Sequence, residues 1–92
     1  MATVSDEKFR ALRGLGHTGA MNDMTLQWLH DGGATSPCLN DAWLEWLSIH
    51  EPLGSFAQRN DWWHEYLATA GYDLAAGSTQ LNDMELAFWA AQ

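Results

Sequence analysis

The sequence predicts an all-α protein, and two observations carry that prediction. A nine-residue phrase such as LNDAWLEWL, from Leu39 to Leu47, occurs in four similar copies, and a looser copy, VSDEKFRAL, opens the chain. Gly or Pro follows each of the first four copies about ten residues after its start. We therefore expect about five short helices from a degenerate repeat of 17–22 residues, packed as a compact, irregular helical array. Residues 1–92 are predicted to form a single helical-repeat domain.

Each copy begins with a helix-start signal. The residue before the Asp is Asn or Ser, whose side-chain oxygen can accept a hydrogen bond from a free amide of the first helical turn. The Asp that follows faces the positive end of the helix dipole. In four copies an apolar residue before the cap has an apolar partner five residues later, as Leu39 has in Leu44, which is the pattern of a hydrophobic staple. The predicted N-caps are Ser5, Asn22, Asn40, Asn60 and Asn82.

Stop signals place the other end of each helix. Gly supplies a left-handed residue after a helix, and Pro cannot continue one. These residues occur at Gly14, Gly16, Gly32, Gly33, Pro52, Gly54 and Gly71. The predicted helices therefore cover residues 6–14, 23–31, 41–50, 61–70 and 83–91. The spacing between predicted caps increases from 17 to 18, 20 and 22 residues, which argues against a regular solenoid.

The pattern inside the copies predicts which faces are buried. With the predicted cap as position zero, apolar residues recur at positions two, four, six and seven, which form two ridges on a helix. Position five is mostly polar and is expected to face solvent. Position three is polar in three copies but is Trp43 and Trp63 in the other two. These two Trp either enclose the third and fourth helices in the core or form a surface where a partner docks.

Two further residues join the candidate interface. Arg59 and His64 replace the apolar staple pair of the fourth copy, and they make either a local polar contact or a contact with an outside ligand. Six Trp are more than a small core easily encloses with every indole N–H paired, so one or two are expected at an interface, where Trp is enriched. The candidate protein interface therefore consists of Trp43, Trp63, Arg59 and His64.

Composition restricts the class of partner. Twelve acidic residues against four basic ones give a net charge of −8, and Arg59 is the only base after Gly14. Such a surface repels nucleic acid. No apolar run is long enough to span a membrane, and the first residues lack the pattern of a signal peptide. A single cysteine, Cys38, excludes an internal disulfide. We expect neither a nucleic-acid nor a membrane partner.

The residues that carry chemistry do not form a recognisable motif. The four histidines lack the spacings HxxxH and HExxH of zinc sites, and GLGHTG, from Gly14 to Gly19, fits neither nucleotide-binding fingerprint. No serine lies in a nucleophile motif. We therefore predict no catalytic, cofactor-binding or metal-binding residue, no cofactor, no small-molecule substrate and no enzymatic activity.

The segment GHTGAMNDMTLQWL, from Gly16 to Leu29, resembles a repeat of tailed bacteriophages. The repeat occurs in small proteins encoded among virion genes and at the ends of some larger structural proteins. The resemblance implies a structural or accessory protein that is made in the host cytoplasm and docks on the virion as a capsid decoration, connector or tail component. Its partners would be other virion proteins of the head or tail, or further copies of itself. The alternative is an acidic mimic of DNA that inhibits a DNA-binding host protein.

Overall fold

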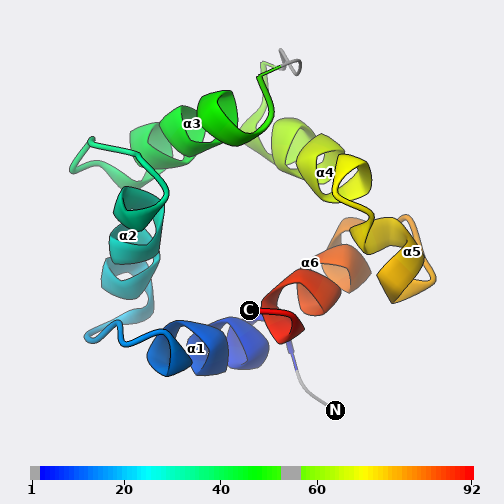
Figure 1. Ribbon diagram of the computed structural model, residues 1–92, viewed down its shortest axis with the longest axis horizontal. Helices are drawn as coiled ribbons and strands as arrows, with labels where there is room; N and C mark the ends of the chain where they lie inside the picture. The colour runs from blue at the N-terminus through cyan, green and yellow to red at the C-terminus, as the bar shows by residue number, and fades with distance from the viewer. Residues whose placement is uncertain (1–2, 53–56) are drawn as a thin grey trace.

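The protein is all-α and compact in the computed structural model, which describes residues 3–52 and 57–92. Within those ranges the helices follow one another around a ring (Figure 1). They are α1 (Val4–Gly14), α2 (Met21–Asp31), α3 (Leu39–His50), α4 (Arg59–Thr69), α5 (Tyr72–Ala76) and α6 (Leu81–Ala90). The ring closes because α1 packs against α6, and the molecule is a flat disc of 33 × 32 × 16 Å.

The helices end where glycine and proline predicted. Helix α1 ends at Gly14, α2 is capped by Gly32, and α3 stops two residues before Pro52. Helix α4 ends at Thr69, just before Gly71, whose φ of 87° lies in the left-handed region that favours glycine. The predicted stop at Gly54 lies outside the described residues.

The predicted N-caps are wrong by two residues in each of the five longer helices. Ser5, Asn22, Asn40, Asn60 and Asn82 lie inside the first turn, and the N-caps are Thr3, Ala20, Cys38, Gln58 and Gln80. Among the helices of residues 3–52 and 57–92, only α1 has a side-chain N-cap: the Thr3 hydroxyl accepts from the Asp6 amide, and the Asp6 carboxylate accepts from the Thr3 amide. The helices start early because the residue before the predicted cap packs as the first helical residue, at Val4, Met21, Leu39 and Leu81, partly buried against the core.

A sixth helix, α5, corrects the predicted count of about five. It lies in the longest gap between predicted caps, between α4 and α6, and packs against both. Gly71 and Gly77 bracket it, both with positive φ, so the chain turns sharply into and out of a single helical turn. The origin of the five longer helices in a repeat stays a prediction.

One buried stripe per helix faces the middle of the disc. Position seven is fully buried in all five long helices, and position six is buried or partly buried. The second ridge was predicted at positions four and seven, and position seven is confirmed. At position four, however, Phe9 is 40% exposed and the other four residues are only partly buried, so that half of the ridge is wrong. Position three takes its place because helices in a ring turn a single face inward, across positions two, three, six and seven.

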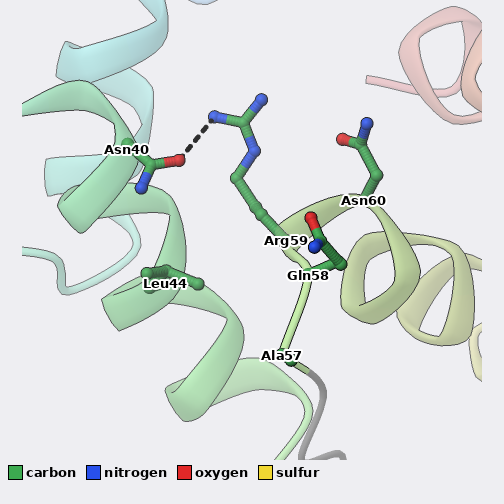
Figure 2. A pocket seen from close by; sticks show the side chains of 6 residues that line it. All are labelled: Asn40, Leu44, Ala57, Gln58, Arg59 and Asn60. Atoms are coloured by element: carbon green, nitrogen blue, oxygen red, sulfur yellow. Dashed lines mark hydrogen bonds between the residues drawn. The ribbon is translucent and has the colours of Figure 1, made fainter.

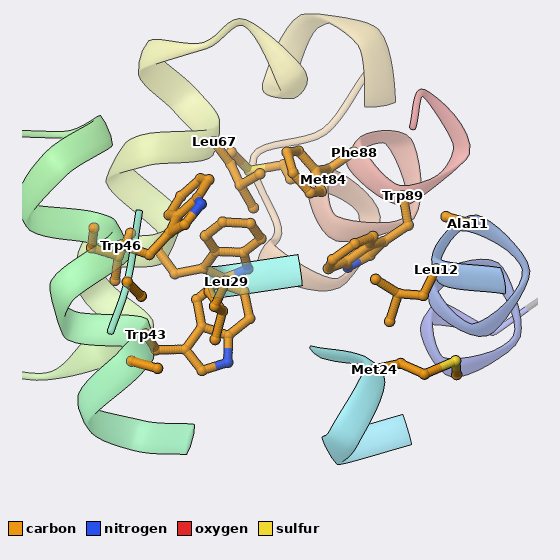
Figure 3. Packing of buried hydrophobic residues seen from close by; sticks show 14 residues of the cluster. Ala11, Leu12, Met24, Leu29, Trp43, Trp46, Leu67, Met84, Phe88 and Trp89 are labelled. Carbon is orange, nitrogen blue, oxygen red and sulfur yellow. The ribbon is translucent and has the colours of Figure 1, made fainter. Parts of the chain in front are cut away.

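Aromatic side chains fill the middle of the ring (Figure 3). Trp43 and Trp63 are only 8% and 5% exposed, and their ring centroids lie 4.9 Å apart. The structure therefore places both in the core of this chain. Trp46 and Trp89 are also buried, while Trp28 and Trp62 are partly buried and packed against the core. The Trp28 ring centroid lies 5.0 Å from that of Trp46 and 5.1 Å from that of Trp89. Short helices of 10 to 12 residues are marginal alone, so this shared cluster is what keeps them folded.

Two polar side chains at position five, Gln27 and Glu45, form hydrogen bonds to the linkers before their helices. The sequence had predicted only that position five faces solvent. The Gln27 amide donates to the Thr18 carbonyl at 2.9 Å and accepts from its N–H. The Glu45 carboxylate accepts from the Thr35 hydroxyl at 2.9 Å and from the Ser36 N–H at 2.8 Å. The Thr35 hydroxyl, with smaller help from the backbone N–H groups, lowers the pKa of Glu45. Each side chain ties the middle of its helix to the preceding linker.

Candidate functional site

The middle of one face of the disc is hollowed. This central hollow has a volume of about 100 Å³ and is lined by Lys8, Trp43, Arg59, Asn60, Trp63 and Glu85. Four of these six residues occupy position three of α1, α3, α4 and α6. Because the ring turns the same side of each helix inward, residues far apart in the sequence meet at this point.

Two of the four basic residues of the chain meet at the central hollow. The Lys8 ammonium lies 5.8 Å from the Trp43 ring centroid and 5.5 Å from that of Trp89. The Arg59 guanidinium lies 5.8 Å from the Trp43 ring centroid. All three distances are in the range of a cation–π contact. Within the described residues, no carboxylate lies at ion-pair distance from either cation.

Glu85 is the only acid of the hollow, and burial controls its titration. Burial raises the pKa of Glu85, while a hydrogen bond from Trp63 and the charges of Lys8 and Arg59 oppose that rise. Burial likewise lowers the pKa of Lys8, against the attraction of Glu85. The hollow therefore brings together charged groups from separate helices, and burial removes part of the water around Lys8 and Glu85.

A second hollow shares lining residues with the first. Its side chains are shown in Figure 2. This outer hollow has a volume of about 280 Å³ and lies between α3 and the start of α4, lined by Asn40, Leu44, Ala57, Gln58, Arg59 and Asn60. The Arg59 guanidinium reaches across it and donates to the Asn40 side-chain oxygen at 3.4 Å. Arg59 and Asn60 line both hollows. A ligand seated at Arg59 therefore has room on both sides.

A third depression lies where α1, α5 and α6 meet. We call it the alanine groove, because its lining residues are Glu7, Ala75, Ala76, Asp83, Leu86, Ala87 and Ala90. Its volume is about 450 Å³. Small side chains form most of its surface, and its two charged residues, Glu7 and Asp83, are both acidic. Next to Ala75 in the sequence, Leu74 is 84% exposed, the most exposed of the large apolar side chains described.

The four histidines each make a contact that joins neighbouring segments. Three bond a backbone carbonyl through Nε2: His30 to Ser36 at 2.7 Å, His50 to Gly32 at 3.0 Å, and His64 to Thr79 at 2.8 Å. The fourth, His17, lies 3.3 Å from an Asp31 carboxylate oxygen. In the described parts of the chain, no three His, Cys, Asp or Glu side chains are grouped so that they could hold a metal ion.

The predicted interface residues are only partly brought together. Trp43, Trp63 and Arg59 meet at the central hollow, whereas His64 bonds Thr79 in the linker before α6. That bond is the local polar contact that one interpretation of His64 predicted. Sequence reasoning missed Lys8 and Glu85. Their shared position three was the available signal, because it places them beside the two Trp once the helices form a ring.

The fold and its hollows define a small acidic all-α protein with an aromatic core and two kinds of open surface, one basic and one apolar. In the part of the chain that the structure describes, every helix is too short or too polar to cross a lipid bilayer. Comparison with known proteins finds no matching family model, no matching curated protein and no matching solved structure.

Proposed function

We propose that this chain is a non-enzymatic protein that docks on other proteins of a tailed-bacteriophage particle, as a capsid decoration, connector or tail component. The alanine groove is the observation that supports docking most directly. Its wall of small apolar side chains leaves room for apolar side chains of a partner, and apolar area removed from water favours association. The GHTGAMNDMTLQWL segment supports a phage particle as the setting.

The acidic residues at the alanine groove indicate that its partner is basic. Glu7 and Asp83 line the groove, and the whole molecule carries a net charge of −8. A helix with one apolar face and flanking Lys or Arg residues matches both properties, since a basic side chain can pair with Asp83, while Glu7 already pairs with Arg10. The proposed occupant is therefore a basic amphipathic helix of another virion protein.

Two matched pairs of variants test this docking surface. Ala90→Trp fills the groove, while Ala68→Trp places the same side chain near the end of α4, away from the groove; both alanines are exposed. Asp83→Lys reverses a charge in the groove, and Asp61→Lys reverses the same charge at the third residue of α4. The measurement is the amount of each variant in purified particles by mass spectrometry, beside its melting curve.

We expect the wild type, Ala68→Trp and Asp61→Lys to be incorporated, and the two groove variants to be reduced by at least about tenfold, as for loss of an interface hot spot. Absence of the wild-type protein from particles would contradict the proposed function. Normal incorporation of both groove variants would instead show that the particle is contacted through another surface.

A further inference from the structure

The central hollow holds an unbalanced set of charges. Lys8 and Arg59 supply two cations, and Glu85 supplies one carboxylate, so the hollow carries one excess positive charge when all three are ionised. Within the described residues neither cation has an ion-pair partner, and both rest over Trp43 instead. This excess is unexpected in a chain with twelve acids and four bases.

The sign of the excess charge selects the ligand. A monoanion between Lys8 and Arg59 would bring the hollow to two positive and two negative charges. A cation would be attracted by Glu85 alone and repelled by both bases. A dianion such as HPO₄²⁻ would bring the hollow to two positive and three negative charges, one of them Glu85, which is already poorly solvated.

The size of the central hollow and the planar Arg59 side chain indicate that the monoanion is a carboxylate. A volume of about 100 Å³ admits a group of only a few heavy atoms, and the planar guanidinium of Arg59 matches the plane of a carboxylate. The outer hollow continues past Arg59 and carries the side-chain amides of Asn40, Gln58 and Asn60. Those amides suit the backbone of a peptide whose last carboxylate reaches inward.

We infer that the central hollow is a binding site for a single carboxylate group held between Lys8 and Arg59, in the space that Trp43 and Trp63 also line. The group comes either from a small free carboxylic acid or from the C-terminus of a protein chain, and the chemistry of recognition is the same. This site is independent of the alanine groove and of the proposed function.

The inference is tested by titrating the ¹⁵N-labelled protein with sodium acetate at pH 7, against sodium chloride at equal ionic strength. We expect acetate, and not chloride, to shift the indole N–H signals of Trp43 and Trp63 in a saturable way. Lys8→Met and Arg59→Gln should each weaken acetate binding by about tenfold or more, the loss expected when a charge-assisted hydrogen bond is removed. Arg13→Gln removes an exposed base that lies over Phe9, away from the hollow, and should change nothing.

Two further titrations identify the source of the carboxylate. A short peptide with a free C-terminus is compared with the same peptide carrying a C-terminal amide. Tighter binding of the free peptide than of acetate assigns the site to a protein C-terminus, and tighter binding of acetate assigns it to a small acid.

Several results would overturn the inference. These are equal responses to acetate and chloride, binding of the amidated peptide as tight as that of the free peptide where the free peptide binds, tighter binding of inorganic phosphate than of acetate, or unchanged acetate affinity in a folded Lys8→Met variant. Melting curves establish that each variant is folded before its affinity is compared.

Discussion

The central hollow and the alanine groove differ in how they are built. The central hollow gathers one register position from α1, α3, α4 and α6, so its walls are core Trp and its charges are poorly solvated. The alanine groove lies where α5 interrupts the succession of longer helices, and small side chains of α5 and α6 form its wall. A substitution in the wall of the central hollow therefore also alters the core. A substitution of an exposed residue of the alanine groove leaves the core intact.

The largest expected difference in stability is between a substitution in the wall of the central hollow and one in α5. Trp63→Ala should reduce the free energy of unfolding by about 3–5 kcal/mol, because Trp63 is 5% exposed and its loss leaves a cavity between Trp43 and Phe88. Leu74→Ala should change it by less than about 0.5 kcal/mol, because that side chain is 84% exposed. Chemical denaturation of both variants measures the difference. Equal losses would contradict the distinction between the two regions.

The second effect concerns α1, which contributes Lys8 to the hollow and Glu7 to the groove. Thr3→Ala removes the only side-chain N-cap among the described helices and should lower stability by about 0.5–2 kcal/mol. Asn40→Ala should have a smaller effect, because Asn40 lies within the first turn of α3 and its side chain only meets Arg59 at 3.4 Å. A larger loss from Asn40→Ala in thermal melts would show that the predicted cap matters after all.

The third effect tests whether Glu85 is poorly solvated. Burial raises its pKa above the ordinary 4.5, so the folded state loses stability as the pH rises from that value through the raised pKa. Glu85→Gln should therefore stabilise the protein at pH 7, by less than about 1 kcal/mol because solvent still reaches the side chain. The gain should vanish below pH 4, where Glu85 is protonated in both states. Glu65→Gln, on the exposed side of α4, is the matched control.

The smallest effect has the opposite pH dependence. The linker hydrogen bonds lower the pKa of Glu45 below the ordinary 4.5, so its contribution to stability is complete above that value and is lost as the pH falls through the lowered pKa. Glu45→Gln should therefore destabilise the protein slightly at pH 7, and its difference from the wild type should shrink on acidification. Melting temperatures between pH 3 and pH 7 measure it. A constant difference would show that charge plays no part in this linker.

Local signals predicted the helices well because each depends on neighbouring residues. Helices α1 and α2 ended where expected, because Gly16 and Gly33, with φ of 94° and 108°, turn the chain just after them, and such a turn is a local property. The start signals failed by two residues because packing of Leu39 and its equivalents extended the helices beyond their polar residues. Helix α5 was missed because a single turn between Gly71 and Gly77 has too few residues to show a period.

The candidate site depended on information that is not local. Trp43 and Trp63 were singled out because position three is polar elsewhere, but whether they were core or surface depended on closure of the ring. Lys8 and Glu85 were passed over for the same reason: they lie 77 positions apart in the sequence and meet only across the contact between α1 and α6. The same register position was the link between all four residues, but only a ring turns that position inward.

Closure of the ring also has a consequence for folding kinetics. Most packed pairs of helices are near neighbours in the chain and can form early, whereas α1 and α6 come from opposite ends of the described sequence and meet only after a long loop has closed. Lys8 and Glu85 of the central hollow, and Glu7 and Ala90 of the alanine groove, lie on these two helices. Opening of this one contact would dismantle both surfaces together. A ligand at either surface therefore holds the ring shut and slows its opening.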